Sequence, residues 1–335
     1  MSSRRREGPP EARERLVNRE KSSKGMIHSY LDVSSKDQLV IKALEALEKR
    51  NPREHKHALS ELRVQGDSAK EKRKAVEARL SLYEKKVGEV KSFLSTHLPR
   101  IEAWLEKENL TPKQRPESIP VFVADHLLYP GVPAQFPRAF GEKFDPSHNG
   151  IFVSPQHGNN VLAHEYVHGM SFDRQKQTGG FCRREGKRTL GNTWLDEAVT
   201  MIGEFATYPT KARYRRDEPD DLYEEGYFWL MQEFQKALGI SEAELLHAYF
   251  GEEPFRSQLE EKTRKRFGCS IEKLDDVFLG SSQKSKEQTL KILKGEPVSL
   301  QTYEGMGLEE KYIQLQRLFP HVSIVVKARP HKQKT

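Results

Sequence analysis

The spacing of apolar residues divides the chain into a helical first third, a short strand-rich middle and a helical remainder. Residues 1–35 contain few large apolar side chains, which predicts a disordered basic tail. From residue 36 apolar side chains recur every three or four positions, the period of an amphipathic helix. This pattern predicts helices over residues 36–51, 54–64, 69–98 and 100–108, which together form a helical N-terminal extension over residues 36–110.

The period changes beyond a proline-rich linker. Three prolines between residues 111 and 120 mark a boundary, and short apolar runs of strand type follow at residues 121–124, 139–144 and 151–154. Asn149 and the glycine after it, between the last two runs, predict a turn with positive φ. The sequence therefore predicts a small sheet whose last strand leads into the next helix.

That helix, with the sequence NNVLAHEYVHGM at residues 159–170, carries the strongest candidate chemistry in the chain. His164 and His168 are four residues apart and project from one helical face, and Glu165 lies beside them. Two imidazoles at this spacing can bind one Zn²⁺, and the adjacent carboxylate can take the proton of a metal-activated water. The H-E-x-x-H arrangement predicts a zinc site with Glu165 as general base, provided that a third ligand exists.

A second predicted helix offers that ligand. Residues 193–208 resume helical spacing after a polar loop at 171–192, with Thr193 as the expected N-cap. A carboxylate on this helix would complete a site of two His and one Glu, which leaves one position open for water and is typical of catalytic zinc. Glu197 is the first candidate, and Glu204, two turns later on the same face, is the second. The buried side of the helix is predicted to consist of Trp194, Leu195, Ala198, Val199 and Ile202.

With these motifs the chain resembles the gluzincin metallopeptidases. HEYVH at 164–168 is followed by WLDEA at 194–198, which is similar to the W-L-N-E-G segment of the aminopeptidase N family, whose Glu is the third zinc ligand. The resemblance covers roughly residues 120–250 and implies that Glu197 binds the metal. Asp196 and Ala198 stand where that family has Asn and Gly. The chain lacks the family's G-x-M-E-N segment, which reads the free amine of a substrate, so endo- and exopeptidase activity both stay open.

The resemblance also implies a residue for the transition state. YEEG at residues 223–226 is similar to the Y-E-K-G segment that contains the family's catalytic Tyr, so Tyr223 would hydrogen-bond the oxyanion of the tetrahedral intermediate. Tyr227 and Tyr214 are alternatives for this role. A core aromatic at the start of a helix is the alternative role for Tyr223 itself.

The strand before the zinc helix is the candidate for substrate binding. As an edge strand, Ile151, Phe152, Val153 and Ser154 would pair through main-chain hydrogen bonds with an extended peptide and hold its carbonyl over the metal. The alternative is a buried strand with no part in binding.

Two further residues have two possible roles each, one in the site and one in the ordinary structure of the protein. Cys182 would cap the metal in a latent form or be a small apolar residue, and His247 would donate to a substrate carbonyl or belong to the core or surface.

Composition narrows the class of protein. The chain has two cysteines, neither an N-terminal apolar segment nor a run of about 18 apolar residues, and we expect a cytoplasmic protein with no membrane partner. The net charge is +7, but residues 1–24 carry eight Lys/Arg against four Glu, and residues 327–335 carry four Lys/Arg against none. The excess of basic residues belongs to the ends, so nucleic-acid binding is a minor alternative.

Helical spacing continues after residue 240. Further helices are predicted over residues 241–250, 255–267, 271–279, 286–293 and 308–319. The expected fold class is α+β: a zincin-like metallopeptidase domain at residues 118–325, with an α+β half at 118–180 and a helical half at 190–325. A basic tail at residues 326–335 would follow it.

The predicted function is a zinc-dependent peptidase with one catalytic Zn²⁺ and a peptide or protein substrate. An alternative from another class is a catalytically silent zincin-like fold that acts as a protein-interaction module. Hydrolysis of a non-peptide substrate at the same site is a third reading of the same residues.

Overall fold

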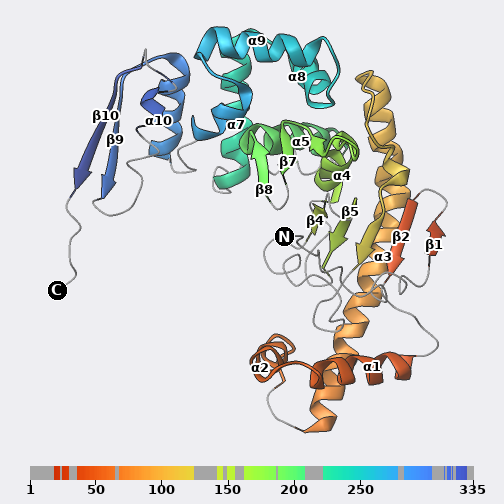
Figure 1. Cartoon of the computed structure of the whole chain (residues 1–335). Helices are drawn as coiled ribbons and strands as arrows, with labels where there is room; N and C mark the ends of the chain where they lie inside the picture. Colours follow the sequence, from red (N-terminus) through yellow and green to blue (C-terminus); the bar gives the residue numbers. More distant parts are fainter. Residues whose placement is uncertain are drawn as a thin grey trace, which may run out of the picture. The chain divides into compact units, whose positions relative to one another are not determined.

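The chain folds into a mixed α+β structure in which helices predominate over small sheets (Figure 1). The computed structural model describes residues 19–22, 25–29, 36–64, 68–123, 142–145, 149–154, 162–185, 188–207, 222–277, 283–303, 313, 315–317, 319 and 322–329. The contacts divide the chain into two compact units, Met1–Arg100 with Arg115–Gly169, and Ile101–Gln114 with Met170–Thr335. The α+β class predicted from the sequence is confirmed.

The first unit begins its helical part with α1 (Lys36–Glu48), α2 (Pro52–Glu61) and the long α3 (Ala69–Lys107). The side chain of Asn51 accepts a hydrogen bond from the backbone N–H of Glu54, so α2 starts with a capped first turn and a proline in its first position. The predicted helices 36–51 and 54–64 are therefore confirmed, with their ends displaced by two or three residues.

α3 is continuous through Pro99, whereas the sequence pattern predicts two helices that meet there. That prediction is wrong because Leu98 and Ile101, on either side of the proline, are fully buried. Their packing outweighs the backbone hydrogen bond that proline removes. The core-facing side of this helix includes Val76, Leu80, Tyr83, Val90 and Leu94, which are all buried.

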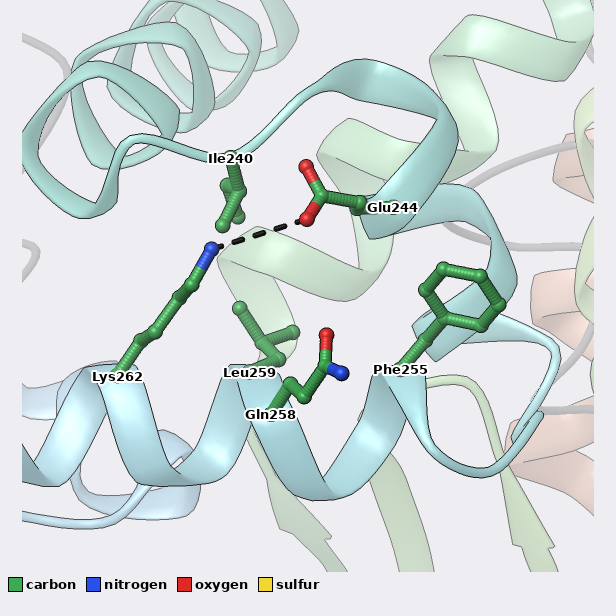
Figure 2. A pocket seen from close by; sticks show the side chains of 6 residues that line it. All are labelled: Ile240, Glu244, Phe255, Gln258, Leu259 and Lys262. Carbon is green, nitrogen blue, oxygen red and sulfur yellow. Dashed lines mark ion pairs between the residues drawn. The ribbon is translucent and has the colours of Figure 1, made fainter.

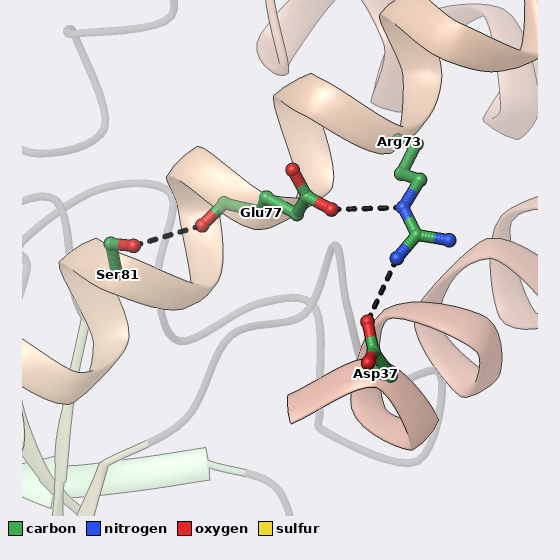
Figure 3. A network of polar contacts seen from close by, with 4 residues as sticks. All are labelled: Asp37, Arg73, Glu77 and Ser81. Carbon is green, nitrogen blue, oxygen red and sulfur yellow. Dashed lines mark hydrogen bonds and ion pairs between the residues drawn. The ribbon is translucent and has the colours of Figure 1, made fainter. Parts of the chain in front are cut away.

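An exposed polar network joins α1 to α3 (Figure 3). The guanidinium of Arg73 donates to Asp37 at 2.8 Å and to Glu77 at 2.9 Å, and the hydroxyl of Ser81 donates to the carbonyl of Glu77 at 3.1 Å. Because these side chains are open to water, the pairs contribute little to stability. The hydrogen bond with Glu77 and its charge raise the pKa of Arg73, which therefore keeps its charge at every pH of interest.

The sheet of the first unit has the strand order β1-β2-β3-β5-β4. Its strands are β1 (Arg19–Ser22), β2 (Gly25–Ser29), β3 (Val121–Val123), β4 (Glu142–Asp145) and β5 (Gly150–Val153). β2, β3 and β5 run parallel, and β1 and β4 are antiparallel to their neighbours. The turn between β4 and β5 has the predicted positive φ, 51° at Asn149.

α3 is tied to this sheet by Tyr83, whose hydroxyl donates to the main-chain carbonyl of Val123 at the end of β3, at 2.9 Å. β1 and β2 lie within residues 1–35, for which the sequence predicts disorder. That prediction does not hold for these two strands, because backbone pairing with β3 supplies the hydrogen bonds and the packing that a polar segment lacks by itself.

The second unit contains a small antiparallel sheet of β6 (Thr178–Gly179), β7 (Cys182–Glu185) and β8 (Arg188–Gly191). The prediction of a polar loop over residues 171–192 is therefore wrong for this stretch. Its strands are too short and too polar to show a two-residue period, and backbone pairing defines them.

Helices make up most of the second unit. They are α5 (Thr193–Thr207), α7 (Leu222–Leu238), α8 (Glu242–Tyr249), α9 (Phe255–Phe267) and α10 (Gln283–Lys294). Short 3-10 turns lie at Ile271–Val277 in this unit and at Pro116–Ser118 in the other. An aromatic row fills the core, since Phe234 packs edge-on against Trp194 and stacks on Phe267, with ring centroids 5.8 and 6.0 Å apart.

Two parallel strands follow α10 and pair with each other, β9 (Val298–Tyr303) and β10 (Ile324–Arg329) (Figure 1). The sequence pattern predicts neither strand, and β10 overlaps the predicted basic tail at residues 326–335. The helix predicted over residues 308–319 lies mostly outside the described residues. In the part of the chain that is described, no helix combines the length and apolarity that a bilayer crossing requires.

Candidate metal centre

The H-E-x-x-H segment forms α4 (Leu162–Ser171), as its spacing predicts. The helix is amphipathic in the expected sense, with one side packed into the core. The buried side consists of Leu162, Ala163, Tyr166, Val167 and Met170. Glu165 and His168 are half-buried and His164 is 7% exposed, so the polar side borders the core without being fully open to water.

The two imidazoles of α4 face each other through the same ring nitrogen. His164 Nε2 and His168 Nε2 are 3.1 Å apart, and the ring planes meet at 69°. If both nitrogens bound one ion at about 2.05 Å, the N–metal–N angle would be about 98°, near the ~109° of a tetrahedral site. The pair therefore has the geometry of two ligands to one metal ion.

Glu197 on α5 completes the group. One ligand atom from each of His164, His168 and Glu197 lies within 4.8 Å of the other two. The three side chains could therefore hold a metal ion.

The competing ligands do not join this group. Glu204 is buried, 1% exposed, two turns further along α5, and Cys182 lies in β7 with intermediate exposure. Over the described ranges, the group formed by the two histidines and Glu197 is the set of His, Cys, Asp and Glu side chains that converges closely enough for a metal. Of the two glutamates proposed from the sequence, the structure favours Glu197.

α5 is held by a different cap from the one predicted. The side chain of Asn192, not that of Thr193, accepts from the backbone N–H of Leu195 at 3.1 Å, and its own amide donates to the carbonyl of Ile271 at 3.0 Å. Asn192 is fully buried, whereas Thr193 is exposed. The five residues predicted to form the buried side of α5 are all buried, which fixes the direction in which Glu197 projects.

The residue before Glu197 anchors the first turn of α5 to the neighbouring hairpin. Asp196 is 7% exposed and accepts a hydrogen bond from the backbone N–H of Phe181 at 2.7 Å. Gly180, with φ of 53°, lies so close that a Cβ there would collide with the Asp196 carboxylate and the Tyr249 ring. Arg256 donates to the carbonyl of Gly180 at 2.9 Å, and its guanidinium lies 4.7 Å from the centre of the Phe181 ring.

Burial lowers the pKa of Arg256, and the charge of Asp196 acts in the opposite direction. Asp196 and Arg256 thus both hydrogen-bond to main-chain groups of the turn between β6 and β7.

The strand proposed for substrate binding is not an edge strand. β5 pairs with β3 on one side and with β4 on the other, so the main-chain groups of Ile151, Phe152 and Val153 are used within the sheet, and these residues and Ser154 are buried. The prediction is wrong because local sequence shows strand character but not strand order. β4 is last in the order of this sheet, and its Phe144 N–H donates to Glu165 Oε2 at 2.6 Å.

The candidates for the oxyanion role have different outcomes. Tyr223 is the second residue of α7, but its side chain lies outside the described residues, and so does all of Tyr214. Tyr227 is a buried core residue, 4% exposed. His247 bonds through Nδ1 to Glu252 Oε2 at 2.8 Å and stacks on Phe255, which supports its structural alternative.

A small pocket lies between the start of α8 and α9 (Figure 2). Its lining consists of Ile240, Glu244, Phe255, Gln258, Leu259 and Lys262. Glu244 and Lys262 form an ion pair of 3.7 Å across it. None of the candidate site residues lines this pocket, so the convergence of ligands, and not the pocket, marks the candidate site.

No family model matches the chain, and neither a search of curated proteins nor one of solved structures finds a match.

Proposed function

We propose that the chain is a zinc-dependent metallopeptidase with a gluzincin-like site and a zincin-like fold. The observation that supports it is the convergence of His164, His168 and Glu197, with Glu165 next to the first ligand on the same helix. Two neutral imidazoles and one carboxylate form a donor set that suits Zn²⁺, and three protein ligands leave a position for water or substrate.

A zinc ion held there would lower the pKa of water toward about 7 and polarise a peptide carbonyl. The rest of the chemistry belongs to Glu165, which accepts the proton of the attacking water and passes it to the leaving amine. Its carboxylate is half-buried and accepts a hydrogen bond from the main chain of β4. Tyr223 is proposed, from the resemblance, to steady the oxyanion.

The proposal is tested in two stages on the full chain. Metal content of the purified protein is measured for the wild type and for Glu197→Ala and Glu204→Ala. We expect about one zinc per chain in the wild type and in Glu204→Ala, and a clear loss in Glu197→Ala. Full zinc retention in Glu197→Ala would move the third ligand elsewhere.

Cleavage of a quenched peptide library, with and without a chelator, follows. Glu165→Gln should retain zinc but lower turnover by about 100-fold or more, the usual range for an acid–base group. Unchanged cleavage by Glu165→Gln would reject the assigned base. Bound zinc without any peptide cleavage by the wild type would favour hydrolysis of another substrate or a protein-interaction module.

A further inference from the structure

An unexpected contact joins the proposed general base to the backbone of β4. Glu165 Oε2 accepts a hydrogen bond of 2.6 Å from the main-chain N–H of Phe144, a residue that belongs to no motif. A bond this short to a carboxylate is charge-assisted and stronger than a bond between neutral backbone groups. It therefore restricts the carboxylate on which the proposed chemistry depends.

The strand pairing explains why this N–H is available. Phe144 stands opposite Ile151 in the antiparallel pair of β4 and β5. The N–H of Ile151 points the other way, to the carbonyl of Pro120 at 2.9 Å. Opposed residues in such a ladder exchange both hydrogen bonds or neither, so the N–H of Phe144 points away from β5, toward the outer side of the sheet. Glu165 supplies the partner that the sheet does not.

A glycine on α4 lets the two elements come this close. Gly169 is four residues after Glu165 and shares its helical face. A Cβ at this position would lie 2.9 Å from Cδ1 of Ile119 and 3.2 Å from two ring carbons of Phe144, closer than normal packing allows. The Phe144 ring is only 6% exposed, so it has no room to retreat without losing contacts. The absence of a side chain at residue 169 thus keeps β4 within reach of Glu165.

We propose that the main-chain N–H of Phe144 is a positioning group that holds the carboxylate of Glu165 through its Oε2 oxygen. The contact itself stands on the geometry of α4 and β4. Its effect on turnover rests on the proposed peptidase function, so the two are measured separately.

The contact is tested by hydrogen exchange followed amide by amide in the full chain, with and without added Zn²⁺. Wild type is compared with Glu165→Ala, which removes the acceptor, and with Glu165→Gln, which retains an oxygen. The N–H of Lys143 is the internal reference, because its residue alternates with Phe144 and belongs to the bonded pairs with β5.

We expect the Phe144 amide to exchange at least tenfold faster in Glu165→Ala than in the wild type. Glu165→Gln should stay close to the wild type, and Lys143 should change by less than twofold in both variants. An equally fast Phe144 amide in wild type and Glu165→Ala would overturn the proposal, whether or not the chain is a peptidase.

The effect on turnover is tested by an amide-to-ester substitution at Phe144, which replaces the N–H by oxygen and keeps the side chain. The same substitution at Glu142 is the matched control, because the N–H of Glu142 lies on the same outward side of β4, two residues earlier. We expect kcat to fall about tenfold or more for the Phe144 ester, with KM and zinc content unchanged, and kcat of the Glu142 ester to stay within twofold of the wild type.

A Phe144 ester with wild-type or higher kcat would overturn the positioning role, and so would an equal fall for both esters. A wild-type chain that cleaves no peptide refutes the proposed function instead, and the exchange rates then decide whether the contact exists.

Discussion

Asp196 should contribute more to stability than its neighbour Glu197, although only the latter is proposed to bind metal. Asp196→Ala removes the acceptor of the Phe181 N–H and the negative charge beside Arg256. A hydrogen bond to a buried carboxylate contributes about 1.5–3 kcal/mol. Arg256 is partly buried and keeps its hydrogen bond to Gly180, so loss of the negative charge of Asp196 adds at most about 1 kcal/mol. The expected loss of unfolding free energy is therefore about 1.5–4 kcal/mol.

Asp196→Asn separates the two contributions. The amide oxygen can still accept from Phe181, whereas the charge is gone, so we expect a loss of only about 1 kcal/mol. Urea denaturation of the metal-free chain, followed by circular dichroism, measures both variants without interference from metal binding. Each midpoint is converted to a free energy with the measured slope.

A double-mutant cycle with Arg256→Met gives the coupling between the two side chains, expected to be about 1 kcal/mol. An Asp196→Ala chain within 0.5 kcal/mol of the wild type (about the ordinary effect of a surface change) would refute the reasoning, because a buried carboxylate that receives a backbone N–H cannot be removed at so little cost.

Two further variants test local features. Tyr166 is fully buried, its hydroxyl has no hydrogen-bond partner among the described residues, and burial raises its pKa. Tyr166→Phe should therefore leave the chain as stable as the wild type, or up to about 2 kcal/mol more stable, in thermal and urea unfolding. A loss of stability above about 1 kcal/mol would contradict this. Glu244 accepts a hydrogen bond from the backbone N–H of Ser241 in a capping box, and this bond lowers the pKa of Glu244 from its ordinary value of 4.5. The stabilisation that Glu244 provides is therefore full above pH 4.5 and is lost as the pH falls through the lower pKa of the folded state. Glu244→Gln should therefore cost about 0.3–1 kcal/mol at pH 7 and nothing near pH 2, as unfolding at the two pH values will show.

Elements with a clear helical period were predictable. α4 and the buried side of α5 follow from spacing alone, and so does the pairing of His164 with His168. The continuity of α3 through Pro99 did not follow, because the cost of proline in a helix is local while the packing that offsets it comes from other elements. The hairpin at residues 178–191 was missed because its strands carry no apolar alternation.

The candidate site shows the same division. Glu197 and Glu204 are seven residues apart on one helical face, and no periodicity separates them. They differ by about 10 Å along the helix axis, and the group of side chains that could hold a metal ion contains Glu197. The order of β3, β5 and β4 likewise decides that residues 151–154 are internal and that Phe144, in no motif, meets Glu165.

The amino-acid sequence by itself determined which residues share a helical face: two imidazoles and a carboxylate on α4, and an acid with an apolar opposite side on α5. The tertiary structure alone decided which strands are internal to the sheet, which glutamate belongs to the group that could hold a metal ion and which backbone N–H binds Glu165. The physical reason is the distance along the chain over which each kind of constraint acts. Helical geometry relates residues three or four apart without reference to the rest of the chain, whereas strand order and the approach of distant side chains depend on packing among segments far apart in sequence.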